Sequence, residues 1–406
     1  MSDVLVLGGG MVGVATALAL QARGHDCLLL DRRAPGEETS YGNAGLIQAE
    51  AAEPYALPWR VWDLARMAVG YRNAVALDPR ALPGQAGALL RYWWQSRPAS
   101  HARISRTYAR LIAEAVPTHA PLIAEAGADN IIHRDGYWDA YRTPGAFDAA
   151  LQEAERMRER HDCAFTPHDG DALGRAEPAL ERRLAGAILW SETWRCSAPG
   201  ELVAAYARLF VARGGTIATG DAMSLEQVGK GWRAAGQEAE RAVVALGPWS
   251  PELLARFGYR VPMVRKRGHH LHFAGTHGLR RALVDAENST VLAPMRQGLR
   301  VATGAAFSTS APAALPRQLR RGEVTARELL PIGEAVEPAA WSGTRPCLPG
   351  MLPLVREAPR HPGLWLHFGH GHHGFTLGPA TAERLARAME GEAEAVARLD
   401  GGLLGH

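Results

Sequence analysis

A glycine-rich turn follows the first apolar run of the chain. Residues 4–7 have the composition of a buried parallel strand and lead directly into GGGMVG. In that segment Gly8, Gly10 and Gly13 fit the pattern G-x-G-x-x-G, and an apolar helical stretch follows. The first glycine permits a tight turn, the second lets the backbone approach a pyrophosphate, and the third lets the helix pack on the strand. This order of elements predicts a dinucleotide-binding unit.

A second apolar run, residues 27–30, ends in Asp31. The spacing between Asp31 and the glycines suits a βαβ unit. In such a unit the start of the helix binds the phosphates, and the acid accepts a hydrogen bond from a ribose hydroxyl. We also expect Val12, at the helix start, and Arg32, beside the acid, to contact the nucleotide. The motif leaves open whether the ligand is NAD or FAD.

The bulk composition excludes several other classes of protein. With 406 residues, 47% of them hydrophobic, the chain can bury the cores of two or three domains. The 45 basic and 42 acidic residues are spread along the chain, which gives no nucleic-acid-binding stripe. Its two lysines, Lys230 and Lys266, leave few candidates for the Schiff-base lysine of a pyridoxal-phosphate enzyme.

The four cysteines are far apart and form neither a disulfide framework nor a zinc ribbon. The apolar opening lacks a basic n-region, and three glycines interrupt it, so it does not predict a signal peptide. No other run is long and apolar enough to span a bilayer. We therefore expect a cytoplasmic protein, with peripheral contact at the inner membrane left open.

The segment after Asp31 contains ETSYGNAGLI, a polar loop where a simple nicotinamide-binding fold would continue with a helix. Without the upstream motif this would be an ordinary surface turn. With it, the chain resembles the D-amino-acid oxidase superfamily of flavoproteins, specifically its bacterial D-amino-acid dehydrogenase branch. The resemblance covers nearly the whole chain and implies non-covalent FAD. It also implies that FAD is contacted by Ser40, Asn43, Ala44, Gly45, Leu46 and, in ALGPWS, Gly247.

The strand pattern and the resemblance together predict an α/β fold. A Rossmann-like FAD-binding domain would be interleaved with an α+β substrate domain that contains a mixed or antiparallel sheet. The strands of the FAD-binding domain are expected at residues 4–7, 27–30, 242–246 and 364–367. That domain would comprise residues 1–50, 196–254 and 341–406, and the substrate domain residues 51–195 and 255–340.

Local patterns predict further elements in the substrate domain. Asp135-Gly136 and Gln297-Gly298 are expected to be hairpin turns. Residues 53–158 are mainly helical in pattern and rich in tryptophan. The spacing of these tryptophans favours packing in a core or a domain interface over a stacking platform. They are Trp59, Trp62, Trp93 and Trp94.

A substrate carboxylate calls for an arginine, because the planar guanidinium gives two parallel charge-assisted hydrogen bonds. The candidates on the expected substrate-facing sheet are Arg265, Arg267, Arg296 and Arg300. For any single arginine, a solvated sheet edge or a salt bridge is the more common role.

The family often has Arg-Gly-Tyr-His where this chain has RGHH, so His269 replaces a tyrosine. We expect His269 and His270 to be candidates for substrate contact. In WSGTRPCLPGMLPLV, Arg345 belongs to the arginine–proline pair of the family, which implies a cofactor contact, while Gly350 replaces the usual aspartate. Cys347 is offset from the position where some sarcosine oxidases bind flavin covalently, and we expect it to be a small buried hydrophobe.

The stretch HFGHGHHGFTLGP, residues 367–379, places four histidines within seven residues. A metal site needs ring nitrogens that converge at about 2.0–2.1 Å, which adjacent histidines in a glycine turn rarely do. We expect no metal here. Instead, a helix that begins around Gly378-Pro379 would direct its partial positive charge at the flavin. The resemblance implies flavin contacts for Gly371, His373, Gly374 and Thr376, and His373 is also a candidate for substrate contact.

The resulting hypothesis is an FAD-dependent dehydrogenase of D-amino acids, in which a hydride moves from Cα to the flavin. The product would be an imine that gives a 2-keto acid. The form of the C-terminal turn resembles members that act on cyclic substrates such as D-proline or hydroxy-D-proline. One alternative is a glycine- or sarcosine-type flavin oxidase that uses oxygen, and another is a non-catalytic nucleotide-binding protein. The electron acceptor, whether a quinone, a carrier or oxygen, stays open.

Overall fold

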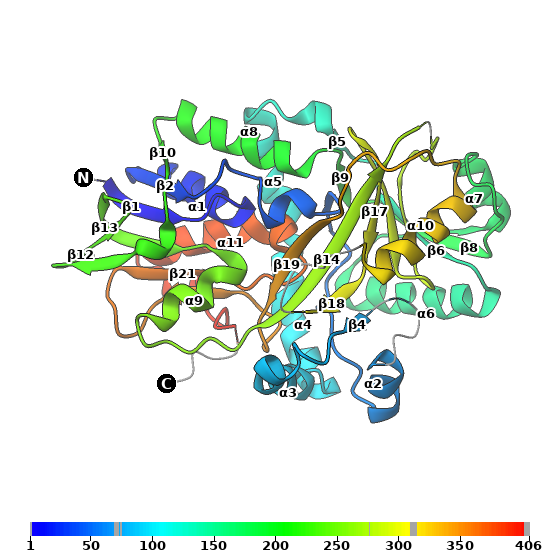
Figure 1. The fold of residues 1–406 in the computed structure, drawn as a ribbon, viewed down its shortest axis with the longest axis horizontal. Coiled ribbons are helices and arrows are strands. Elements are labelled where there is room, and N and C mark those ends of the chain that lie inside the picture. The colour runs from blue at the N-terminus through cyan, green and yellow to red at the C-terminus, as the bar shows by residue number, and fades with distance from the viewer. Residues whose placement is uncertain (1, 69–72, 74, 276, 309–314, 402–406) are drawn as a thin grey trace.

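The computed structural model is built on three β-sheets and describes residues 2–68, 73, 75–275, 277–308 and 315–401. Eight strands form the sheet at the left of Figure 1: β1 (Ser2–Leu7), β2 (Cys27–Asp31), β10 (Thr216–Thr219), β11 (Glu226–Val228), β12 (Gly231–Ala234), β13 (Gln237–Val244), β20 (Leu354–Glu357) and β21 (Leu364–Phe368). The main path of this sheet has the order β10-β2-β1-β13-β12-β11. Off this path, β21 pairs with β13, and β20 pairs with β21.

The four strands expected from the apolar runs pair in parallel at the centre of this sheet. β1 lies between β2 and β13, and β21 lies on the other side of β13. Val4 and Val6 enter one hydrophobic cluster while Leu5 and Leu7 enter another, so both faces of β1 are covered. The Rossmann-like part of the predicted fold is thus confirmed, while the predicted domain limits stay a prediction.

Ten strands form the sheet at the centre and right of Figure 1: β4 (Val75–Leu77), β6 (Tyr137–Tyr141), β7 (Thr166–Asp169), β8 (Gly186–Trp190), β14 (Val264–Phe273), β15 (Ala282–Asp285), β16 (Thr290–Met295), β17 (Gly298–Thr303), β18 (Ala305–Phe307) and β19 (Trp341–Cys347). The sheet is mixed, because β6 runs parallel to β15 and β18 to β4, while the other pairs are antiparallel. The turn predicted at Gln297-Gly298 joins β16 to β17.

The hairpin predicted at Asp135-Gly136 is wrong. The strand before it, β5 (Ile132–His133), pairs with β9 (Trp194–Cys196) in a small third sheet that also holds β3 (Leu46–Ile47). The strand after it pairs with β8 and β15 in the ten-stranded sheet. The glycine does adopt a positive φ of 74°, but its turn carries the chain from one sheet to another. Turn residues alone do not reveal which partner a strand takes.

Eleven α-helices are present in the described residues: α1 (Met11–Gln21), α2 (Val61–Ala68), α3 (Ala86–Gln95), α4 (Pro98–Ala113), α5 (Ala115–Glu125), α6 (Pro144–His161), α7 (Gly170–Ala176), α8 (Pro199–Ala212), α9 (Ser250–Ala255), α10 (Arg317–Leu329) and α11 (Gly374–Met389). α1 packs against both α8 and α11 beside the eight-stranded sheet. α10 covers part of the ten-stranded sheet, where it contacts β14, β16 and β17 (Figure 1).

The last helix begins earlier than predicted. α11 starts at Gly374, so Pro379 lies inside the helix and not at its first turn. A proline there cannot donate to the carbonyl four residues before it, which is that of Phe375. The imidazole of His119, on α5, lies 3.0 Å from this carbonyl oxygen and supplies the missing donor through Nε2. This contact from another helix allows α11 to continue through the proline.

The prediction that the four tryptophans pack in a core or an interface is wrong for three of them. Trp93 packs against a hydrophobic cluster, but Trp59 is itself 36% exposed. Trp59 and Trp93 stack with ring centroids 4.6 Å apart, but Trp62 is 78% exposed and Trp94 is 53% exposed. These two belong to α2 and α3 at the lower edge of the molecule (Figure 1). A helix at an edge can keep a helical apolar pattern although nothing in the described chain covers that face.

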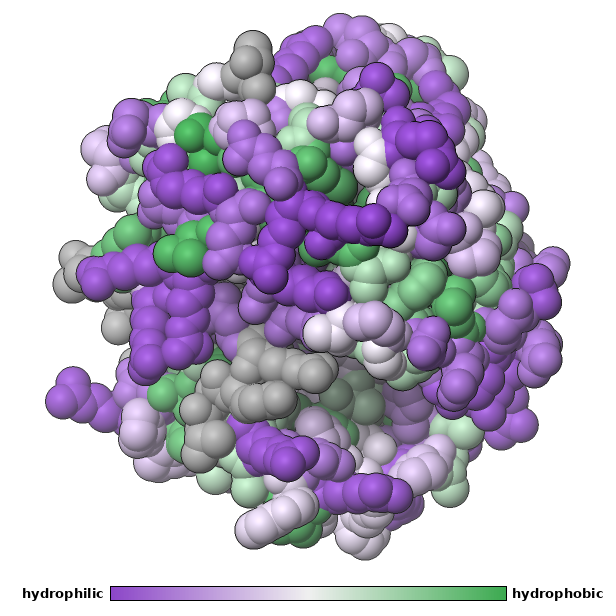
Figure 2. Space-filling view, turned by 90° about the vertical axis from the view of Figure 1, so that its right-hand side faces the viewer, coloured by the Kyte–Doolittle hydropathy of each residue, from purple (hydrophilic) through white to green (hydrophobic). Residues whose placement is uncertain are grey.

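The surface at the right-hand end of the molecule is mainly hydrophilic, with hydrophobic residues in small groups (Figure 2). Among the described helices, none has the length and the apolar character required to cross a membrane. All four cysteines are buried and unbridged, and Cys347 is 4% exposed.

Candidate active site

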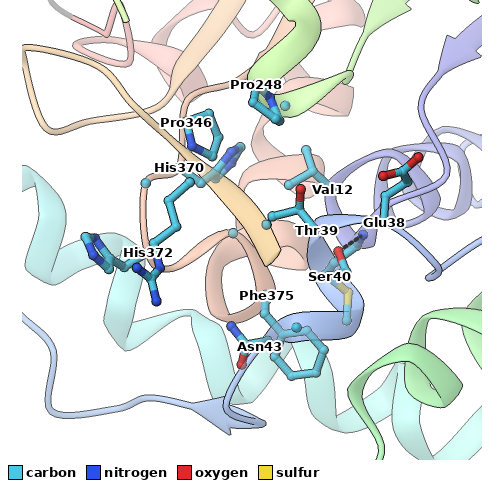
Figure 3. A pocket seen from close by; sticks show the side chains of 18 of the residues that line it. Val12, Glu38, Thr39, Ser40, Asn43, Pro248, Pro346, His370, His372 and Phe375 are labelled. Carbon is cyan, nitrogen blue, oxygen red and sulfur yellow. Dashed lines mark hydrogen bonds between the residues drawn. The ribbon is translucent and has the colours of Figure 1, made fainter. Parts of the chain in front are cut away.

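A cavity of about 620 Å³ is lined by both large sheets. The eight-stranded side contributes the turns that follow β1, β2, β13 and β21. The ten-stranded side contributes residues of β6, β14 to β17 and β19. In Figure 3, Val12, Glu38 and Ser40 lie on one side of the pocket, opposite His370 and His372. Segments far apart in the sequence therefore converge on one space.

The glycine turn has no room for side chains at two of its positions. A Cβ on Gly13 would lie 1.8 Å from the carbonyl oxygen of Gly8, and a Cβ on Gly8 would lie 2.6 Å from that of Ala245. The N-cap of α1, Gly10, provides no side-chain cap, and the first turn carries no acid. The amide of Met11 donates to a serine hydroxyl of the next loop. The rest of this helix end suits a phosphate group, because it combines N–H groups with a partial positive charge.

The acid at the end of β2 closes the same turn. The Asp31 carboxylate accepts hydrogen bonds from the backbone amides of Gly9 and Arg33. The guanidinium of Arg32 donates to Glu38 over 2.7 Å and lies 4.6 Å from the ring centroid of Trp249. Asp31, Arg32 and Trp249 all line the cavity, so this end offers an acceptor and a flat aromatic surface to a nucleoside.

Most of the residues predicted to contact the cofactor line this one cavity. They are Gly8, Gly10, Val12, Asp31, Arg32, Ser40, Asn43, Ala44, Leu46, Gly247, Arg345, Gly371, His373 and Gly374. Three others do not line it: Gly13, Gly45 and Thr376. A Cβ on Gly45 would lie 2.1 Å from the carbonyl oxygen of Cys196, and Thr376 donates to the carbonyl of Leu46. These three hold the lining segments in place, so their predicted direct contact with FAD is not supported by their positions.

The four histidines of the C-terminal turn divide into two pairs. His367 and His370 both lie within hydrogen-bond distance of Thr381 Oγ1, through their Nε2 atoms, at 2.8 and 2.9 Å. His367 Nδ1 also lies 2.7 Å from Thr16 Oγ1, so this pair ties β21 and its turn to α1 and α11. No group of three potential metal ligands occurs in the described residues.

All four histidines line the cavity, and His372 and His373 also lie against the ring of Tyr55. His373 Nδ1 is hydrogen-bonded to the hydroxyl of Tyr108, whereas its Nε2 is buried without a partner in the described structure. Burial lowers the pKa of His373 to about 4, with the charge of Arg345 adding to the effect. The ring is therefore neutral near pH 7.

Arg345 extends from β19 into the cavity and carries the clearest unbalanced charge of this site. Its Nη1 donates to the carbonyl of Gly304 over 3.0 Å, and no ion pair with a described carboxylate compensates it. Burial lowers its pKa, which reports the cost of holding a cation in this environment. Its Nη2 lies 2.6 Å from where a Cβ on Gly268 would be, so this glycine makes room for the guanidinium.

The other predicted arginines do not line the cavity. Arg265 donates to the carbonyl of Pro248, Arg267 to the hydroxyl of Ser342, and Arg296 forms an exposed ion pair with a glutamate. Arg300 is buried but donates to backbone carbonyls of the loop after β2. These arginines hold loops and strands together, and the choice of a carboxylate clamp among them stays a prediction.

The two neighbouring histidines of β14 have different surroundings. His269 lines the cavity, and its Nδ1 is buried without a partner among the described residues. His270, which alternates to the other face of the strand, is stacked on Trp341 with ring centroids 4.8 Å apart and does not line the cavity. Burial lowers the pKa of His269 to about 4. His269 thus stays a candidate for substrate contact, whereas His270 is a packing residue.

Sequence reasoning missed several polar residues at the far end of the cavity. They are Gln48, Tyr55, Tyr137 and Asp139. Gln48 follows GNAGLI directly, and the segment Tyr137–Tyr141 alternates in the manner of a half-buried strand, which are the only local signals. Neither signal shows that this strand face points toward the glycine turn.

The chain is similar to known flavoproteins along almost its entire length. A model of the DAO family, described as FAD dependent oxidoreductase, matches residues 3–388. The chain belongs to this family. This DAO-family oxidoreductase is 29% identical to a D-amino-acid oxidase of Bradyrhizobium diazoefficiens, over 96% of this chain and 95% of the relative. It is 30% identical to a D-amino acid dehydrogenase of Dechloromonas aromatica, over 96% and 97% of the two chains.

A solved structure shows the same fold at lower identity. The crystal structure of a glycine oxidase from Bacillus cereus superposes on this DAO-family oxidoreductase with a TM-score of 0.69 and 19% sequence identity. The match covers 100% of this chain and 99% of the glycine oxidase chain. The predicted family, fold and FAD cofactor are confirmed. The cavity fits this cofactor, because the uncapped start of α1, the glycine cradle and the buried open Nε2 of His373 all lie along it.

Proposed function

We propose that this oxidoreductase dehydrogenates D-amino acids to imines, which water hydrolyses to 2-keto acids and ammonia. The observation that carries the proposal is the half-buried guanidinium of Arg345, which enters the cavity without an ion-pair partner in the described chain. A substrate carboxylate would supply the missing charge in a bidentate contact. The names of the two curated relatives support the D-amino-acid class.

Bound FAD supplies the redox chemistry by accepting the hydride from Cα, while the amine gives up its proton. The positive charge of Arg345 disfavours a second cation nearby, which favours the neutral amine that this reaction needs. His269 and His373, whose pKa values burial lowers to about 4, add neutral hydrogen-bonding groups near pH 7. Tyr55 and Trp341 add aromatic rings to the lining of this cavity.

Three finer points belong to the same proposal. Arg345 would contact the substrate and not, as predicted from the sequence, the cofactor. Cyclic substrates such as D-proline or hydroxy-D-proline would be accepted among others. Electrons would then pass to a quinone, a carrier or oxygen in a cytoplasmic location, which the four unbridged cysteines favour.

Anaerobic mixing with a panel of D- and L-amino acids, glycine and sarcosine tests the proposal. The flavin absorbance at about 450 nm should decrease with the D-isomers and not with their L-enantiomers. Bleaching by glycine or sarcosine but by no chiral D-amino acid would favour the amine-oxidase alternative and overturn the proposal. Reoxidation of the bleached enzyme by air or by a soluble quinone then identifies the acceptor class.

A further inference from the structure

The end of the cavity formed by the ten-stranded sheet presents several hydrogen-bond acceptors. We call the lining residues Gln48, Tyr137 and Asp139 the acceptor wall. Tyr137 and Asp139 alternate along β6 and therefore project from the same face of the sheet. Gln48 reaches the same region from the loop after β3.

The donors of the acceptor wall are directed away from the cavity by a buried acid behind it. Glu50, 8% exposed, accepts from the hydroxyl of Tyr137 over 2.9 Å and from the side-chain amide of Gln48 over 2.5 Å. A third donor, the hydroxyl of Thr193, completes this shell. A tyrosine has one hydrogen to donate, and the amide nitrogen of Gln48 is engaged. Tyr137 therefore still offers oxygen lone pairs, and Gln48 offers its carbonyl oxygen together with the second N–H of its amide.

Asp139 adds a carboxylate to the same wall. Its Oδ2 accepts from the hydroxyl of Tyr141 over 2.8 Å, and no described residue donates to its Oδ1. Burial raises the pKa of Asp139 to about 6, so the group is mostly ionised at pH 7 and above. An ionised carboxylate with an open oxygen in a cavity calls for a hydrogen-bond donor.

Tyr55 lines the same cavity as Arg345 and the acceptor wall, and the charges of Arg345 and Asp139 both act on it. Burial raises the pKa of Tyr55 to about 12, with Glu50 and Asp139 adding to the rise and Arg345 opposing it. The charges that act on Asp139 are those of Glu50 and Asp285, and Arg345 is not one of them. A substrate held by its carboxylate at Arg345 would therefore meet the acceptor wall with its side chain.

Independent observations mark this space as a binding site and not only as an acidic region. His269 Nδ1 and His373 Nε2 are buried ring nitrogens without partners in the described structure, and both residues line the same cavity. The two histidines are 4% and 3% exposed. Val284 and Val291 lie between the polar groups in the lining, which suits the methylene groups of a substrate side chain.

We propose that the acceptor wall makes this enzyme prefer D-amino acids whose side chain ends in a hydrogen-bond donor, either a hydroxyl or an ammonium group. The inference rests on the proposed D-amino-acid oxidation and on Arg345 as the carboxylate contact. Asp139 is then a residue that determines specificity, because it contacts the end of the substrate side chain and not the reacting Cα.

Three straight-chain substrates of equal length test the preference. D-norleucine, 5-hydroxy-D-norvaline and D-ornithine end in a methyl, a hydroxyl and an ammonium group. At pH 8 we expect kcat/KM to be at least about tenfold higher for one or both donor substrates than for D-norleucine, since a hydrogen bond to a charged group contributes about 1.5–3 kcal/mol. Preference for D-ornithine identifies an ammonium as the natural end group, and preference for 5-hydroxy-D-norvaline identifies a hydroxyl.

The substitution Asp139→Asn assigns the effect to the acceptor wall. Its side-chain amide can donate to a hydroxyl but leaves an ammonium without an anionic acceptor. We expect kcat/KM to fall at least about tenfold for D-ornithine and only a few-fold for 5-hydroxy-D-norvaline, and to change least for D-norleucine. The matched control is Asp129→Asn, which removes an acid that forms an exposed ion pair with Arg134 outside the cavity.

The outcomes separate this inference from the proposed function. If none of the three substrates bleaches the flavin, the proposed function fails and the inference fails with it. If all three are oxidised with equal kcat/KM by the wild-type enzyme, D-amino-acid oxidation stands and the inference alone is overturned. An equal loss for all three substrates in Asp139→Asn, with unchanged flavin content and melting temperature, would also overturn it.

Discussion

The two ends of the cavity are built from different kinds of structure. At the nucleotide end, the glycine turn, the start of α1 and Asp31 lie within one continuous segment and offer mainly backbone groups. At the substrate end, Arg345, His269 and Asp139 come from three separate strands of the ten-stranded sheet and offer side chains. One end recognises a cofactor shared by a large family, and the other can change residue by residue without disturbing it.

This contrast explains where each end is sensitive. The nucleotide end depends on the absence of side chains, because Cβ atoms at its glycines would overlap backbone atoms. The substrate end depends on charges and hydrogen-bonding groups that have no internal partner. Substitutions at the nucleotide end should therefore remove the cofactor. Substitutions at the substrate end should leave a folded flavoprotein with altered activity.

The largest effect is expected from Gly13→Val. The Cβ would lie 1.8 Å from the carbonyl oxygen of Gly8, so α1 must move away from the turn. We expect the free energy of unfolding to fall by about 3 kcal/mol or more, and we expect bound FAD to be lost. The ratio of absorbance near about 450 nm to protein absorbance measures the flavin content.

The control for this substitution is Gly174→Ala on α7, where a Cβ would meet nothing within 4 Å. We expect that variant to keep its flavin and to be equally stable or more stable by up to about 1 kcal/mol. A Gly13→Val enzyme with full flavin content and wild-type melting temperature would contradict the distinction between the two ends.

An effect of intermediate size is expected from Arg345→Met. Loss of the carboxylate contact should cost about 2–5 kcal/mol of binding, which is a fall in kcat/KM of roughly 30- to 4,000-fold. Removal of a half-buried cation that has no ion-pair partner in the described chain should not lower the melting temperature. Steady-state kinetics and thermal unfolding measure the two effects separately.

Arg265→Met is the matched control, because Arg265 lies outside the cavity lining and its Nη2 donates to a backbone carbonyl. Its kcat/KM is expected to stay within a few-fold of wild type. If Arg265→Met were the more damaging change, the carboxylate contact would have to be reassigned to the outer part of β14.

The smallest effect is expected on the free energy of unfolding when the pH is lowered. Burial lowers the pKa values of His269 and His373 from 6.5 to about 4. Between these values the unfolded chain binds more protons, so stability is complete above pH 6.5 and is lost as the pH falls toward 4. Each histidine contributes at most about 1.4 kcal/mol per pH unit. Denaturant unfolding at pH 7, 6 and 5 should show this slope, and His269→Gln should reduce it.

An unchanged slope in His269→Gln would mean that this ring is not buried in its neutral form. The glutamine keeps a side chain of similar reach with both a donor and an acceptor, so the variant tests protonation more than packing.

The sequence predicts the nucleotide end almost completely because its signals are local. Residues 4–31 contain a strand, a glycine turn, a helix and a second strand in the order that the fold requires, and close backbone neighbours explain Gly8 and Gly13. The parallel pairing of β1 with β13 and of β13 with β21 also follows, since buried parallel strands read as continuous apolar runs.

The substrate end could not be predicted because its residues meet only through long-range pairing. Asp139 reaches the cavity because β6 pairs with β15 and β8, and no local pattern around Asp135-Gly136 indicates those partners. With so many arginines in the chain, position alone did not distinguish Arg345 from Arg265 or Arg296. What distinguishes Arg345 is that its charge lies in the cavity lining without an ion-pair partner in the described chain, which only the assembled structure reveals.

The contact between His119 and the carbonyl of Phe375 has a consequence for how this chain can change during evolution. Pro379 leaves that carbonyl without its own helix donor, and the imidazole on α5 replaces it. A lineage that lost His119 first would carry an orphaned carbonyl beside the cofactor, whereas one that lost Pro379 first would make the imidazole dispensable. Neutral drift can therefore replace both residues without the cost of an orphaned carbonyl only if Pro379 is lost before His119.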